Sequence, residues 1–167
     1  MRRQVGERNW RKVAEEGIQG VYEATETVWT REYCRALESI GCSTFVIAGS
    51  EYTTDGLQDR VIYGGFFGAF VEFKGPTTRV SPAQGRVALK MWARRPYTNF
   101  FMRRVAGTFL ATLYLGNDPS FERPVGVLRT PREFVRKMQE ISLEGMRRIL
   151  AAESDLRSGK KVEFAWP

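Results

Sequence analysis

The chain has 167 residues, of which 43% are hydrophobic, and a formal net charge of +7. This size and composition predict one globular domain, and no apolar run reaches the roughly 18 residues of a membrane span. The chain contains no histidine, which excludes Ser-His triads, histidine general bases and His-rich zinc sites.

The N-terminal segment, residues 1–27, is polar and mixed in charge, and we expect it to form a basic arm or a short helix. No apolar segment follows Arg2 and Arg3, so a signal peptide is not expected. Cys34 and Cys42 do not have the spacing of metal ligands. Two free thiols are typical of a cytoplasmic protein, so we expect that location, or the host cytoplasm if a virus encodes the chain.

Hydrophobic periodicity and β-branched content predict four elements in the first half of the chain. They are a helix over residues 28–40 and strands over residues 43–48, 60–63 and 67–74. Gly64-Gly65 lies between the last two strands and predicts a hairpin turn.

Ser81-Pro82-Ala83-Gln84 is a typical helix start, because serine caps, proline fits the first turn and glutamine completes a capping box. This helix is expected to run to about Arg95. Phe100 and Phe101 then fall in a predicted loop. We expect them to pack in the core rather than to stack on bases, with a homodimer contact as the alternative.

The remaining predicted elements are strands over residues 108–115 and 124–128 and a helix over residues 130–153. The element order predicts an α/β fold with a single mixed central sheet flanked by helices. The predicted domain covers residues 28–153, and residues 154–167 form a tail.

An acid before the third predicted strand and an acid–lysine pair at its end are the candidate catalytic residues. Side chains alternate along a strand, so Glu72 and Lys74 share a face, and Asp59 can join them from a neighbouring strand. Two carboxylates and the carbonyl of Phe73 suit Mg²⁺ or Mn²⁺, and Lys74 could orient a nucleophile or stabilise charge on a phosphate. The pattern predicts phosphodiester hydrolysis, with Asp55 as an alternative to Asp59.

The stretch between Glu72 and Asp118 contains no acidic residue. A block whose charged residues are all positive, beside a carboxylate cluster, favours binding of a nucleic acid backbone. The alternative is a basic helix face that is simply exposed to solvent. Besides Lys74, the candidate DNA-binding residues in this block are Arg79, Arg86, Lys90, Arg94, Arg95, Arg103 and Arg104.

The succession of Gly-x-x-Asp at residues 56–59, an apolar strand, Glu-x-Lys at 72–74 and Ser-Pro-x-Gln at 81–84 resembles the PD-(D/E)XK nuclease superfamily. Within it, the VRR-NUC branch is the most similar. The resemblance implies a restriction-endonuclease-like αβββαβ core and a metal-dependent DNA endonuclease, often acting on branched, flapped or junction DNA. Gln58 stands where the family usually has proline.

The resemblance also implies a catalytic role for Gln84 and an upstream helix glutamate that helps to bind the metal. Glu32 is assigned to that position, with Glu23, Glu26 and Glu38 as alternatives. Two other functions remain open: a non-catalytic nucleic-acid-binding module on the same fold, and an assembly protein whose basic face meets an acidic protein surface.

Overall fold

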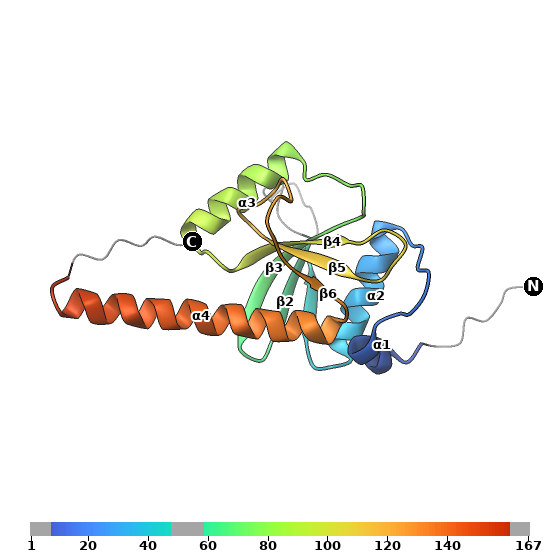
Figure 1. Cartoon of the computed structure of the whole chain (residues 1–167), viewed down its shortest axis with the longest axis horizontal. Coiled ribbons are helices and arrows are strands. Elements are labelled where there is room, and N and C mark those ends of the chain that lie inside the picture. Colours follow the sequence, from blue (N-terminus) through green and yellow to red (C-terminus); the bar gives the residue numbers. More distant parts are fainter. Residues whose placement is uncertain (1–7, 48–58, 161–167) are drawn as a thin grey trace, which may run out of the picture.

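The computed structural model describes residues 8–47 and 59–160. Four helices and six strands follow one another along this part of the chain (Figure 1). They are α1 (Trp10–Glu16), α2 (Glu26–Glu38), β1 (Ser43–Val46), β2 (Arg60–Gly64), β3 (Phe67–Lys74), α3 (Pro82–Arg94), β4 (Asn99–Arg104), β5 (Ala111–Leu115), β6 (Pro124–Leu128) and α4 (Pro131–Arg157).

The strands form one six-stranded sheet in the order β1-β2-β3-β4-β5-β6. Neighbouring strands are antiparallel except β3 and β4, which are parallel. A parallel pair needs a crossover connection, and α3 supplies it. The predicted α/β fold with one mixed central sheet is therefore confirmed.

Helices cover both faces of the sheet. In Figure 1, α3 lies above the sheet and α4 runs below it. On the α4 side, Phe73, Met102 and Leu113 belong to the main core, together with residues of α1, α2 and α4. On the other side, Ala88 of α3 packs with Phe101 and Tyr114 in a smaller cluster. We call the side that carries α3 the α3 face.

The largest error of the sequence prediction concerns β4. Phe100 and Phe101 do not lie in a loop but in a central strand, where they are 1% and 0% exposed. The strand was missed because it is buried on both faces, so it shows no alternation of polar and apolar residues. The expectation that both rings pack in the core is confirmed, and the alternative of a homodimer contact through this pair is wrong.

Arg104 also has a structural role. Its side chain is 5% exposed, and its guanidinium donates hydrogen bonds to the main-chain carbonyls of Tyr22, Ala24 and Thr108. Arg104 thereby fastens the segment before α2 to β4. It is not free to meet DNA, contrary to the sequence prediction.

We expect Arg104→Ala to lower the free energy of unfolding by about 2–4 kcal/mol, because buried carbonyl groups lose a charged donor. Urea denaturation of this variant beside Arg95→Ala, which removes an exposed arginine, measures the effect. A loss below about 1 kcal/mol for Arg104→Ala would show that water replaces the guanidinium at little cost.

The segment that leads to α2 is part of the folded domain. Val13, Ala14 and Tyr22 are buried in the main core, and Tyr22 N–H donates to the Gly107 carbonyl. Within the described ranges, none of the helices is long and apolar enough to cross a membrane.

Candidate active site

The candidate catalytic residues meet at one end of the sheet. Because β2 and β3 are antiparallel, Asp59, just before β2, lies beside Glu72 and Lys74 at the end of β3. The register also places Glu72 and Lys74 on the α3 face. Gln84 comes to the same place from the first turn of α3.

A continuous set of hydrogen bonds joins these groups. Lys74 Nζ lies 2.8 Å from Glu72 Oε1 and donates to Gln84 Oε1 at 3.0 Å. The Gln84 amide in turn donates to Glu72 Oε1. The Asp59 main-chain N–H donates to Glu72 Oε2 at 3.2 Å, and Phe73 N–H donates to Asp59 Oδ2 at 3.3 Å. The structure thus brings together all four residues predicted as catalytic.

Gln84 is held by the start of its own helix. Its N–H donates to Ser81 Oγ at 3.2 Å, while its side-chain oxygen accepts from Ser81 N–H at 3.0 Å. This is the predicted capping box. The capping role of Gln84 is therefore confirmed, and the cap fixes the amide that contacts Glu72 and Lys74.

The carboxylates of the cluster are electrostatically unfavourable neighbours. Glu72 is 1% exposed, and burial together with the charge of Asp59 raises the pKa of its carboxyl to about 7 against the opposing effect of Lys74. Burial also raises the pKa of Asp59, although Lys74 and the Phe73 N–H oppose the shift. An additional cation would relieve this repulsion.

The structure does not bring Glu32 to the cluster. Its carboxylate accepts hydrogen bonds from Tyr22 Oη at 2.6 Å and from Arg8 at 3.1 Å, on another side of α2. Glu26 takes the expected position instead, since it accepts from Gly75 N–H at 2.6 Å and its charge contributes to the raised pKa of Asp59. The assignment of the upstream acid to Glu32 is thus corrected to Glu26.

Glu26 was one of the alternatives in the sequence, and the signal that favours it is the helix start. Thr25 caps α2, so the helix begins at Glu26 rather than at Val28. Its first turn points toward the end of β3, and Glu32, six residues later, is rotated by roughly 120° around the helix axis. Glu26 and Asp59 also line a common pocket of about 210 Å³.

The donor chemistry of this cluster suits a hard divalent cation. Carboxylate and main-chain carbonyl oxygens are ligands of Mg²⁺, which is commonly held by one or two carboxylates and retains several waters. Among residues 8–47 and 59–160, no three His, Cys, Asp or Glu side chains form a complete metal-binding group. Asp59 and Glu72 are the two carboxylates of the cluster that could hold a cation, and Phe73 could add only its main-chain carbonyl, since its ring is buried in the core.

We expect Glu26→Gln to slow any metal-dependent reaction at this site by roughly tenfold or more, because the amide cannot supply the carboxylate charge beside Asp59. Glu32→Gln is the matched control and should leave the rate within about twofold. Rates of both variants under one set of conditions measure the difference. A slow Glu32→Gln beside a normal Glu26→Gln would restore the original assignment.

Most of the predicted DNA-binding residues lie at the surface around α3. Five of the cations are exposed: Arg79, Arg86, Lys90, Arg94 and Arg95. Arg103 is half-buried, with its guanidinium 5.0 Å from the centre of the Phe121 ring, and it pairs in register with Lys74 on β3. With Arg104 excluded, the block still carries its positive charge on the side of the molecule that holds the cluster.

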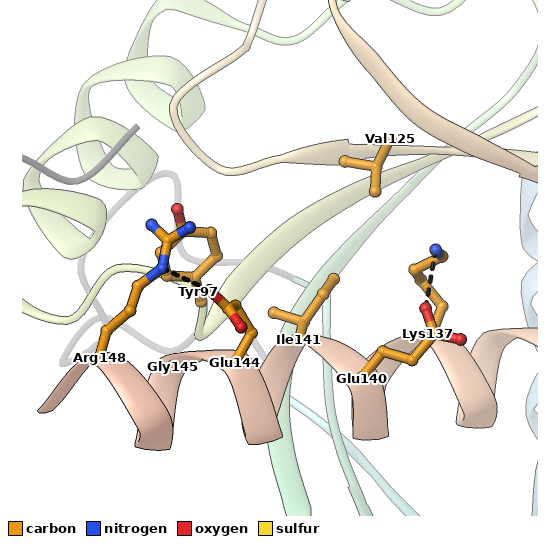
Figure 2. A pocket seen from close by; sticks show the side chains of 8 residues that line it. All are labelled: Tyr97, Val125, Lys137, Glu140, Ile141, Glu144, Gly145 and Arg148. Carbon is orange, nitrogen blue, oxygen red and sulfur yellow. Dashed lines mark hydrogen bonds and ion pairs between the residues drawn. The ribbon is translucent and has the colours of Figure 1, made fainter. Parts of the chain in front are cut away.

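Figure 2 shows a different pocket, between α4, Tyr97 and Val125. Its charged side chains pair along α4: Lys137 with Glu140 at 2.9 Å and Arg148 with Glu144 at 2.8 Å. Opposite charges therefore cancel at its rim, and the pocket has no carboxylate cluster of the kind found at the end of β3.

Cys34 and Cys42 are both free and buried, as the sequence predicted for two unpaired thiols. Burial raises the pKa of the Cys34 thiol to about 11, which makes it a poor nucleophile at neutral pH.

No family model matches this chain, and no curated protein or solved structure matches it either. The candidate site therefore rests on its own geometry.

Proposed function

We propose that this chain is a metal-dependent DNA endonuclease that hydrolyses phosphodiester bonds. The observation that carries the proposal is the meeting of Asp59, Glu72 and Lys74 at the end of β3, with Gln84 bridging the last two. Carboxylates and a lysine that lie together can promote attack on a phosphodiester, and the exposed basic helix beside them can bind its phosphates.

In this proposal Lys74 stabilises the developing negative charge on the phosphate or orients the attacking water. Its ammonium already lies between Glu72 and Gln84, which hold it in place before a substrate arrives. Preorganised donors of this kind stabilise transition-state charge because little reorganisation is needed during the reaction.

Asp59 and Glu72 are the residues that would hold Mg²⁺ or Mn²⁺, with the Phe73 carbonyl as a further ligand. Glu26 would add negative charge beside Asp59. When bound, such a cation lowers the pKa of water and neutralises charge on a phosphate. The protein groups would position the cation, exclude bulk water around Glu72 and keep Lys74 beside Glu72.

DNA is the proposed partner because of the charge around α3. Arg86, Lys90 and Arg94 are spaced four residues apart, so they form one exposed stripe along the helix. Phosphate contacts from such a stripe make binding independent of sequence and sensitive to salt.

One observation favours a non-catalytic alternative. The Glu72–Lys74 pair is 1% and 5% exposed, as in buried ion pairs that only specify a fold. In that case the chain would be a nucleic-acid-binding or assembly protein, and replacement of the pair would alter stability without removing any reaction.

Cleavage of a panel of labelled DNAs tests the proposal. The panel contains a linear duplex, a single strand, a flap and a four-way junction, each incubated with Mg²⁺, Mn²⁺ or EDTA. We expect cleavage of at least one substrate with either metal and none in EDTA. Intact substrates throughout, together with salt-sensitive binding, would instead support the non-catalytic alternative.

A further inference from the structure

Part of the α3 face carries exposed aromatic side chains. Helix α3 packs on the sheet through Ala88, which meets Phe101 of β4 and Tyr114 of β5. Toward the β1 edge of the same face, Phe45 of β1 is 55% exposed and Tyr63 of β2 is 53% exposed. We call Phe45, Val61, Tyr63 and Phe70 the aromatic platform, since three of the four are aromatic.

The platform continues directly from the carboxylate cluster. Phe45, Val61 and Phe70 are aligned across β1, β2 and β3 by the strand register. Val61 lies two residues after Asp59, and Phe70 lies two residues before Glu72. Side chains two residues apart share a face, so this row is about 7 Å along the sheet from the acids.

The rings of the platform are held in place by the protein itself. Phe45 and Tyr63 meet edge to face, with ring centres 6.0 Å apart and planes at 73°. Tyr63 also lies over Gly68, where a Cβ atom would come within 2.9 Å of the Tyr63 ring. The absence of a side chain at position 68 therefore lets Tyr63 rest on the backbone of β3.

We propose that the aromatic platform binds unpaired bases of DNA next to the cleaved phosphate. Bases stack on aromatic rings whatever their sequence, whereas a duplex keeps its bases stacked on one another. The platform shares its sheet face with the cluster and with the basic helix α3, and such a combination of rings and cations suits single-stranded nucleic acid.

This inference rests on the proposed nuclease function and makes it more specific. A base held on Phe45 or Tyr63 would place its own strand beside Asp59 and Glu72. The enzyme would then select DNA that has unpaired nucleotides at the cleavage position, and a fully paired duplex would bind through α3 alone.

Binding of labelled oligonucleotides in EDTA tests the inference without any cleavage. The test variant is the double replacement Phe45→Leu/Tyr63→Leu, which keeps apolar area but removes both rings. The matched control is Phe45→Tyr/Tyr63→Phe, which keeps both rings. Fluorescence anisotropy gives the affinity of each protein for a single strand and for the corresponding duplex.

We expect the leucine variant to lose roughly 5- to 150-fold in affinity for the single strand, the effect of about 1–3 kcal/mol per stacked base. Its affinity for the duplex should change by less than about twofold, and the ring-preserving variant should match the wild type. Equal single-strand affinity of the leucine variant and the wild type would overturn the inference, as would an equal loss on both DNAs.

A measurement on the unaltered protein guards against misfolded variants. A single strand containing 5-bromouracil, irradiated in the complex, should cross-link to Phe45 or Tyr63, as identified by mass spectrometry. Cross-links found only elsewhere would overturn the inference. A wild-type dimer in light scattering that becomes monomeric in the leucine variant, with unchanged DNA affinity, would assign the platform to a second copy instead.

The outcomes separate the two proposals. If the wild-type protein cleaves DNA but removal of the platform rings does not change its affinity for single strands, the nuclease function is retained and the base-binding role of the platform is rejected. If the protein binds single strands through Phe45 and Tyr63 but cleaves no DNA in Mg²⁺ or Mn²⁺, the base-binding role of the platform is retained and the nuclease function is rejected.

Discussion

Glu72→Gln is expected to reduce the rate of DNA cleavage by roughly 10³-fold or more, because the site loses one of the two carboxylates that would hold the cation. Glutamine has nearly the same shape, so the fold should be preserved. Its single carbonyl oxygen can accept from Lys74 in place of Glu72 Oε1, whereas the Asp59 N–H loses its acceptor, Glu72 Oε2. Rates under single-turnover conditions measure the loss. Glu144→Gln, on the exposed surface of α4, is the control and should retain the wild-type rate.

Glu72→Gln should also be more stable than the wild type in EDTA at alkaline pH. The native carboxyl has a pKa of about 7 against an ordinary value of 4.5, so the folded protein binds this proton more tightly than the unfolded chain does. The resulting stabilisation is present below pH 4.5 and is lost as the pH rises to about 7.

Urea unfolding in EDTA at pH 5 and pH 8 measures this effect of Glu72. We expect the wild type to lose stability between the two values, relative to Glu72→Gln, because it must then carry a buried negative charge. If Glu72→Gln is the less stable protein at pH 8 and still cleaves DNA normally, the cluster is a structural ion pair and the proposed function is wrong.

Lys74→Met should produce the second large effect, a loss of roughly 10²- to 10³-fold in kcat, because the ammonium is the cation in direct contact with Glu72 and would stabilise charge on the phosphate. Substrate binding should change far less, since the proposed function assigns most of the phosphate contacts to the exposed cations around α3. Lys90→Met is the matched control and should weaken binding while leaving kcat nearly unchanged.

Two outcomes for Lys74→Met would contradict this account. One is a change in KM alone, which would make Lys74 a simple phosphate-binding residue. The other is a wild-type kcat in a protein that unfolds more easily, which would make Lys74 a structural partner of Glu72. Measurement of kcat and KM beside the unfolding midpoint distinguishes these outcomes.

The sequence predicted the parts of the fold that depend on local signals. Strand β3 was predicted with its observed bounds. Helix α3 begins where Ser81 and Gln84 predict its start, and it ends within one residue of the prediction. Strand β4 was missed because its buried residues and two arginines show no period. Its identity is decided by pairing with β3 and β5, which are distant in sequence.

The candidate site was predicted in type but not in every member. Strand alternation placed Glu72 and Lys74 together, and the hairpin supplied Asp59. The choice of Glu26 over Glu32 depended on where α2 begins, which is a matter of two residues at a helix end. Arg104 was wrongly assigned to DNA binding because the sequence shows only its charge. That charge is the same whether the guanidinium binds phosphate or donates to the carbonyls of Tyr22 and Ala24.

If Asp59 and Glu72 form a metal-dependent nuclease site, cleavage should depend on Mg²⁺ and on both carboxylates. Protein stripped with EDTA is titrated with Mg²⁺ on the best substrate, beside Asp59→Asn. We predict no cleavage without metal, a rate that rises and saturates with Mg²⁺ for the wild type, and no measurable rate for Asp59→Asn. Cleavage that persists in EDTA, or that Asp59→Asn performs as well as the wild type, would contradict the account.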